Sequence, residues 1–245
     1  MERTRYKILV IFLIFLCASA RASYKSEIYA AYVYNNMANW KRIIDKMDGL
    51  KNKSPNLIFE LVNYQYGYIA WCIGNQKKDE AKRYLELAES NISLLEKARA
   101  NQSLVNSYKS AFYGYRIGLN KLLAPYLGGR SLECANLAIE QDKENPFGYI
   151  QYGNIQFYMP PVFGGSKREA LDYYIKAQKI MEKNAADIIE NWNYLSLLIV
   201  IAQSNYYLKD YKTSVYYLEK ILKIEPDFGY VKTELYPQVQ TKMKR

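Results

Sequence analysis

Histidine is absent from all 245 residues of the chain, and only three cysteines occur. Histidine is the commonest general base and a frequent metal ligand, so its absence excludes the usual catalytic triads and most metal sites. The acidic residues lie at surface helical spacing beside lysine, as Asp79 and Glu80 do, rather than forming paired catalytic carboxylates. We therefore expect a non-catalytic protein that holds no cofactor and no metal.

Cys72 and Cys134 lack CxxC spacing and fall within predicted helices. Two alternatives stay open for them: a disulfide formed in an oxidising compartment, or two small buried residues in helix packing. We favour the second.

Glycine and proline are sparse, with 12 and 7 residues, and no linker rich in them divides the chain. This predicts a single domain over residues 23–245. The net charge is +10, but lysine and arginine are spread along the helices beside glutamate, which is typical of a solvated face. Weak attraction to an anionic envelope surface stays open as peripheral association.

The first 22 residues have the pattern of a secretory signal peptide. Three basic residues within positions 3–7 precede the apolar run at 8–20, and small residues follow at Ala20 and Ala22. The run is short for a membrane span. Cys17 follows a leucine where a lipobox requires a small residue, so a lipoprotein is disfavoured. We predict cleavage near Ala22 and export to the periplasm, which argues against a nucleic-acid partner.

Helical periodicity continues through the rest of the chain, and each break carries a start or stop signal. Ser54 and Asn145 each precede a proline at a first helical position, and Ser166 with Glu169 forms a capping box. These signals predict an all-α chain of five helix pairs and a closing helix. The predicted helices cover residues 24–35, 40–50, 55–73, 79–98, 104–123, 131–143, 146 onward, 166 onward, 191–208, 211 onward and 228–242.

Two segments of the form Pro, two residues, Gly-Gly occur 36 residues apart, ending at Gly128-Gly129 and Gly164-Gly165. We predict that each is a lengthened turn between the two helices of a pair, with a backbone geometry that a Cβ would obstruct. Neither Gly-Gly is followed by Gly-Lys-Ser or Gly-Lys-Thr, so a phosphate-binding loop is not favoured.

The spacing of a turn aromatic, a small residue, two apolar residues and a proline near the C-terminus resembles the second helix of a tetratricopeptide (TPR) repeat. The chain as a whole is similar to exported TPR proteins of Gram-negative bacteria. The resemblance implies a TPR-like α-α superhelix built to hold a partner. The matching residues are Gly67, Ala81, Leu85, Ala88, Gly114, Ala135, Ala138, Gly153, Ala170, Tyr174, Ala177, Ala202, Tyr211, Ser214, Leu218, Ile221 and Pro226.

In TPR proteins the first helix of each pair lines the concave face, and this resemblance implies an aromatic, nearly uncharged groove here. The implied residues are Tyr64, Tyr68, Trp71, Tyr108, Tyr115, Phe147, Asn154, Phe157, Tyr158, Gln203, Tyr206 and Tyr207. Tyrosine is unusually abundant, with 26 residues, so several of these rings also suit packing between pairs. We expect a scaffold that docks a protein or peptide through this face. The alternative is an accessory protein, of the kind associated with solute uptake, with a small apolar ligand in an aromatic cavity.

Overall fold

The computed structural model describes residues 23–243, and its regular elements in that range are all helical. They are, in order, α2 (Tyr24–Val33), α3 (Met37–Asp48), α4 (Pro55–Gly74), α5 (Lys78–Lys97), α6 (Gln102–Leu119), η1 (Lys121–Leu123), α7 (Ala124–Gln141), α8 (Pro146–Tyr158), η2 (Pro161–Phe163), α9 (Lys167–Met181), α10 (Ala185–Ile188), α11 (Trp192–Tyr207), α12 (Tyr211–Ile224), η3 (Val231–Leu235) and α13 (Tyr236–Met243). The predicted all-α class is confirmed. The predicted signal peptide, its cleavage point and Cys17 lie outside the described residues.

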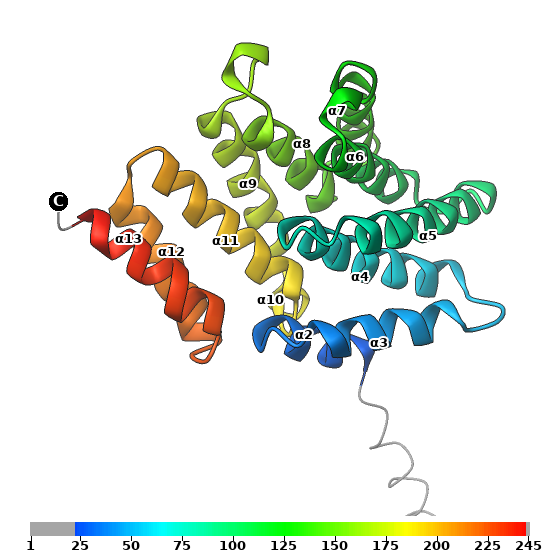
Figure 1. The fold of residues 1–245 in the computed structure, drawn as a ribbon, viewed down its shortest axis with the longest axis horizontal. Coiled ribbons are helices and arrows are strands. Elements are labelled where there is room, and N and C mark those ends of the chain that lie inside the picture. Colours follow the sequence, from blue (N-terminus) through cyan, green and yellow to red (C-terminus); the bar gives the residue numbers. More distant parts are fainter. Residues whose placement is uncertain (1–22, 244–245) are drawn as a thin grey trace, which may run out of the picture.

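The helices pack as neighbouring pairs, which Figure 1 shows as a curved row running from α2 to α13. The pairs are α2 with α3, α4 with α5, α6 with α7, α8 with α9, and α11 with α12, and α13 covers α12. Each pair also contacts the next one along the chain. This arrangement agrees with the predicted five pairs and closing segment.

The predicted start signals of three helices are confirmed by their capping hydrogen bonds. The side chain of Ser54 accepts from the backbone N–H of Leu57, 3.3 Å away, and opens α4. Ser166 accepts from the N–H of Glu169 at 3.2 Å and opens α9. Asn145 caps α8 in the same way. Each cap satisfies an N–H that the helix itself leaves without a partner, which fixes where the helix begins.

The predicted turn at Gly128-Gly129 is wrong, because both glycines lie inside α7, which begins at Ala124 and not at Ser131. Pro125 occupies the first turn of this helix, where its missing N–H costs nothing. A Cβ on either glycine would meet no atom within 4 Å. The actual turn lies at η1, where Asn120 accepts from the N–H of Leu122.

The second predicted turn, at Gly164-Gly165, is confirmed. Gly164 has φ +95°, a left-handed conformation that favours glycine. A Cβ on Gly165 would lie 1.9 Å from the carbonyl oxygen of Met159. Two further differences from the predicted elements are the short helix α10 and the closing segment, which begins with the π-helical turn η3 before α13.

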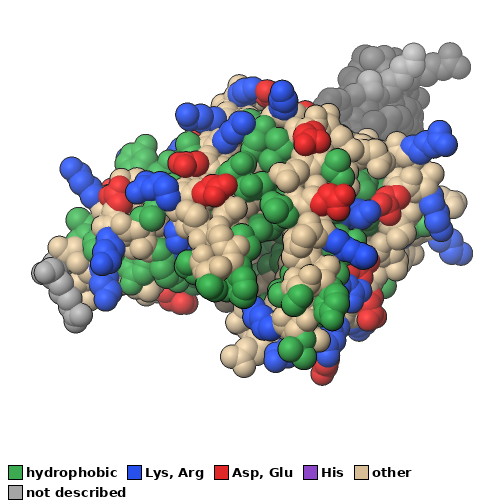
Figure 2. Space-filling model, turned by 90° about the horizontal axis from the view of Figure 1, so that it is seen from above, with side chains coloured by type: hydrophobic (Ala, Val, Ile, Leu, Met, Phe, Trp, Pro, Cys, Tyr) green, Lys and Arg blue, Asp and Glu red, His purple; other side chains and the backbone are tan. Residues whose placement is uncertain are grey.

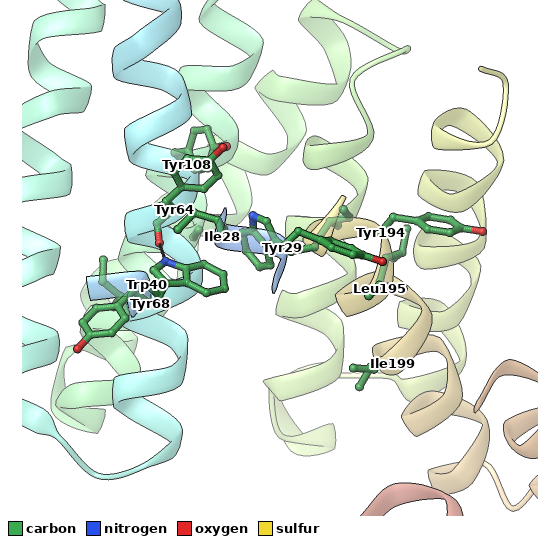
Figure 3. Packing of buried hydrophobic residues seen from close by; sticks show 14 of the residues in the cluster. Ile28, Tyr29, Trp40, Tyr64, Tyr68, Tyr108, Tyr194, Leu195 and Ile199 are labelled. Carbon is green, nitrogen blue, oxygen red and sulfur yellow. Dashed lines mark hydrogen bonds between the residues drawn. The ribbon is translucent and has the colours of Figure 1, made fainter. Parts of the chain in front are cut away.

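The first pair also contacts the fifth pair and the segment that follows α12, both far away in the sequence. The Tyr29 hydroxyl donates to the Glu225 carboxylate at 2.8 Å. The Tyr32 ring lies edge-on to Phe228, with 5.2 Å between centroids. Trp40 of α3 meets Trp192 of α11 at 5.1 Å, and Figure 3 shows Trp40 and Tyr29 within the buried cluster of this region. The row of pairs is therefore curved enough for its beginning to reach its end.

No helix between residues 23 and 243 combines the length and the hydropathy needed to cross a membrane. Cys72 in α4 and Cys134 in α7 are both buried and both free. Both are therefore small buried residues in helix packing, and they do not form a disulfide. Burial raises the pKa of the Cys72 thiol to about 11.

Candidate functional site

A pocket of about 150 Å³ opens between four helices, α4, α6, α8 and α11. These are the first helices of the second to fifth pairs, so the side chains that line the pocket all come from one helix of each pair. Its lining residues are Tyr66, Ala70, Tyr115, Phe147, Ile150, Asn154, Tyr158, Asn193, Ser196, Leu197 and Val200. None of them carries a charge at neutral pH. Figure 2 views the molecule from above and shows hydrophobic side chains around a hollow near the middle of that face.

An aromatic wall forms one side of the pocket. The Tyr66 and Tyr115 rings are stacked, with centroids 5.5 Å apart and planes 17° apart. The Tyr115 hydroxyl donates to the backbone carbonyl of Tyr66 at 3.2 Å. Phe147 lies edge-on to Tyr66 at 6.5 Å. Burial raises the pKa of Tyr115 well above its usual value, so its phenol stays neutral.

The two amide side chains of the pocket, Asn154 and Asn193, are hydrogen-bonded to the protein itself. The Asn154 amide donates to Gln151 at 3.1 Å, and its oxygen accepts from the Tyr174 hydroxyl at 2.8 Å. Asn193 donates to Asn63 at 3.1 Å. These bonds hold both amides in fixed orientations at the pocket wall. A ligand therefore meets mainly rings and aliphatic groups, with a few oriented dipoles.

Tyr158 at the end of α8 projects from the pocket wall into solvent, with 72% of its surface exposed. Its pKa is nevertheless raised, chiefly by loss of hydration, with smaller contributions from Tyr66, Tyr207 and Tyr230. The Tyr158 ring lies on the wall of a recess. Its surface is accessible to solvent, but many protein atoms surround it and reduce the hydration of its hydroxyl. Tyr207 is also exposed. The two rings offer open aromatic faces near the pocket.

Phe157 and Lys167 pack against these two rings. Phe157 is buried and lies 5.0 Å from Tyr158 and 5.6 Å from Tyr207. The Lys167 ammonium lies 3.8 Å from the Phe157 ring centroid and donates to the Phe157 carbonyl at the end of α8. Burial lowers the pKa of Lys167. Lys167 of α9 thus fixes Phe157 in place, while the Tyr158 ring that packs against Phe157 stays exposed to solvent.

Comparison with solved structures finds a related fold. The HusA haemophore from Porphyromonas gingivalis matches with a TM-score of 0.57 and 20% identity, over 76% of this chain and 93% of that chain. BtubC (BKLC) from P. vanneervenii matches with a TM-score of 0.41 and 14% identity, over 87% of this chain and 89% of that one. No family model and no curated protein matches the sequence. At these identities, the similarity to the haemophore concerns the fold alone.

The residues predicted for the concave face fall into three groups. Tyr115, Phe147, Asn154 and Tyr158 line the pocket. Gln203, Tyr206 and Tyr207 line a separate recess of about 50 Å³ between α11, α12 and the closing segment. Tyr64, Tyr68, Tyr108 and Phe157 are buried, and with Trp71 they lie outside both linings.

The prediction that Tyr64, Tyr68, Tyr108 and Phe157 lie on an open face is wrong, because all four side chains are buried. In α4 a different face from the predicted one reaches the pocket. Tyr68 points to the second helix of its own pair and donates to Glu80 at 2.9 Å. Tyr64 donates to Glu60 at 2.7 Å and is buried. Trp71 stacks on Tyr68 and carries Lys77 4.6 Å above its ring. The face of α4 that reaches the pocket is that of Tyr66 and Ala70.

Seven lining residues were not predicted from the sequence: Tyr66, Ala70, Ile150, Asn193, Ser196, Leu197 and Val200, the last four of them in α11. One signal was available in α4, where Tyr66 and the small Ala70 are four residues apart and so share a helix face. In α11 the apolar residues cover almost the whole circumference, and no periodicity separates the pocket side from the core side. Within residues 23–243, no three His, Cys, Asp or Glu side chains gather in a way that would hold a metal ion.

Proposed function

We propose that this chain is an exported, non-enzymatic binding protein of TPR-like architecture that holds a small, mainly apolar molecule in the pocket of α4, α6, α8 and α11. The observation that carries the proposal is the composition of that pocket. Eleven uncharged residues line it, four of them aromatic, and its amides are fixed by bonds within the protein. Such a lining favours a ligand that binds through ring faces and apolar contact.

The size of the pocket indicates how the ligand is held. A cavity of 150 Å³ holds one benzene-sized group, whereas whole drug-sized ligands occupy roughly 300–1,000 Å³. The ligand would therefore insert one ring and rest its remainder on the exposed face of Tyr158. An extended peptide of several residues needs a longer trough. This size favours the small-ligand alternative over the peptide-docking scaffold.

The fold shared with a haemophore makes a porphyrin the first ligand to test. The lining contains no His, Cys or Met to coordinate an iron. Tyrosine ligates haem iron in some proteins, but the raised pKa values of Tyr115 and Tyr158 disfavour the phenolate form that would do so. The lining therefore suits contact with one edge of a flat ring system and provides no His, Cys or Met ligand for the metal. We therefore expect a metal-free porphyrin to bind about as well as haem does.

The test is a titration of tryptophan and tyrosine fluorescence with haemin, with metal-free protoporphyrin and with a small neutral aromatic compound. Ala70→Phe should block the pocket, because Ala70 is exposed and lines it. Ala30→Phe is the matched control, since Ala30 is also an exposed helical alanine and lies outside the pocket.

We expect saturable quenching that Ala70→Phe weakens by about tenfold or more and Ala30→Phe leaves unchanged. Tyr115→Ala should also weaken binding, because it removes half of the stacked pair. If none of the three compounds gives saturable quenching, or both phenylalanine variants reduce it equally, the pocket is not the binding site. Binding of haemin alone would contradict recognition through the ring system.

A further inference from the structure

Two turns project from one edge of the molecule and carry large apolar side chains into water. The first is η1 with the start of α7, where Leu122 and Tyr126 are exposed by 80% and 75%. The second is η2, where Val162 and Phe163 are exposed by 83% and 73%. Figure 1 shows both turns at the same edge, one above α8 and the other at the start of α7. We call Leu122, Tyr126, Val162 and Phe163 the apolar edge.

These four side chains are not required to form the two turns. The η2 turn is fixed by its backbone: Gly164 has φ +95°, the N–H of Gly165 bonds the Pro160 carbonyl, and the N–H of Ser166 bonds the Gln156 carbonyl at 3.1 Å. Asn120 likewise holds η1 through the N–H of Leu122. Polar residues at the four positions would keep the same turns and avoid exposing apolar surface. Two rigid turns that present such side chains together point to a surface that they contact.

The two stretches of chain that contain the turns carry basic residues and no acidic ones. No aspartate or glutamate occurs from residue 97 to 132 or from 145 to 168, the two stretches that contain the turns. Lys121 and Arg130 flank the first turn, and both are exposed. Lys167 and Arg168 follow the second. Elsewhere the chain mixes acidic residues with basic ones, as in α5, so the absence of carboxylates here is local.

We propose that the apolar edge docks onto an anionic membrane surface. Aliphatic and aromatic side chains at turn tips enter the boundary between headgroups and acyl chains, and flanking cations attract the anionic lipid headgroups. A protein partner would need carboxylates or a complementary groove to match these tips, and nothing in their chemistry specifies one. This inference does not depend on the pocket binding a ligand.

The experiment is co-sedimentation of the chain from Ser23 onward, which includes every described residue and lacks the predicted signal peptide. The probes are vesicles of phosphatidylcholine alone and vesicles that also contain phosphatidylglycerol. We expect binding to the phosphatidylglycerol vesicles that falls as salt is raised. The double variant Leu122→Ser with Phe163→Ser should weaken it by about tenfold or more. Lys121→Gln and Arg130→Gln should each weaken it about fivefold.

Leu94→Ser and Tyr216→Ser provide controls, because Leu94 on α5 and Tyr216 on α12 are exposed apolar residues away from the edge. Circular dichroism of every variant should show the wild-type helical signal, which tests that each variant is folded. No sedimentation with anionic vesicles would overturn the proposal, and so would equal losses in edge and control variants. Capture of a purified envelope protein by the same edge, without vesicle binding, would also overturn it in favour of a protein partner.

Discussion

Gly67 lies where three helices meet, and replacing it with alanine tests the packing most directly. A Cβ at this position of α4 would lie 2.7 Å from ring atoms of both Trp40 and Trp192. Carbon atoms prefer about 3.5–4.0 Å, so at least one ring must move. Trp40 is fully buried, and its indole N–H donates to the Tyr64 carbonyl at 2.9 Å. Movement of either ring therefore strains a packed and hydrogen-bonded group.

Two effects of opposite sign determine the outcome of Gly67→Ala. Alanine is favoured over glycine inside a helix by about 0.5–1 kcal/mol. Overpacking a filled core costs about 1–3 kcal/mol. The Trp192 indole N–H also donates to Asn63 at 2.9 Å, and losing such a bond adds about 0.5–1.5 kcal/mol. We expect a net loss of about 1–3 kcal/mol in the free energy of unfolding.

Gly114→Ala is the matched control, because Gly114 lies inside α6 and a Cβ there would meet nothing within 4 Å. It should gain about 0.5–1 kcal/mol from helix propensity alone. Urea unfolding followed by circular dichroism measures both variants. If Gly67→Ala proves as stable as Gly114→Ala, the close approach of the two tryptophans to α4 is not real, and the contact between the first and fifth pairs is wrong with it.

Three further predictions concern stability and chemistry. Ala177→Phe should cost about 1–3 kcal/mol in urea unfolding, because Ala177 is fully buried in α9; a wild-type curve would contradict this helix register. Stability should be flat from about pH 6 to about pH 8, since the chain has no histidine. The free energy of unfolding should fall above about pH 10, because burial raises the pKa of Tyr32 and Tyr108 in the folded state. Their neutral forms stabilise the fold fully below the unfolded pKa near 10. This contribution is lost as the pH rises toward the folded pKa. Unchanged stability at about pH 11 would refute this. Cys72 and Cys134 should react with Ellman's reagent in urea and not in native protein, since burial raises both thiol pKa values; no reaction in urea would indicate a disulfide.

The helix pairs could be predicted from sequence because their boundaries depend on local chemistry. Ser54, Asn145 and Ser166 cap helices through bonds that span at most three residues, and such signals are readable without knowing the fold. The turn predicted at Gly128-Gly129 was wrong because it relied on the same kind of local signal. Paired glycines signal a turn, yet in α7 they follow a proline that starts the helix, and open space beside them leaves the helix intact.

The candidate site was predicted in part. Expecting the first helix of each pair to supply the binding face led to Tyr115, Asn154 and Tyr158, which line the pocket. Which face of α4 reaches the pocket was not predictable, because it is set by contacts far away in the sequence. Trp40 and Trp192 both need the space over Gly67, and this requirement places Tyr66 and Ala70 toward the pocket. The apolar run of α11 carried no signal for which side faces the pocket.

The contact between the first and fifth pairs also affects how such a protein can change in length. A stack in which each helix pair contacts only its neighbours can gain or lose a pair. Its total stability is then the sum of the stabilities of the single pairs and of the contacts between neighbouring pairs. Here Trp192 and Phe228 are buried in part by residues of α2 and α3, so deleting the first pair would expose both rings. Inserting a pair in the middle would separate Tyr29 from Glu225. The number of pairs is therefore fixed by geometry, and the chain should unfold in one cooperative step instead of fraying from its ends.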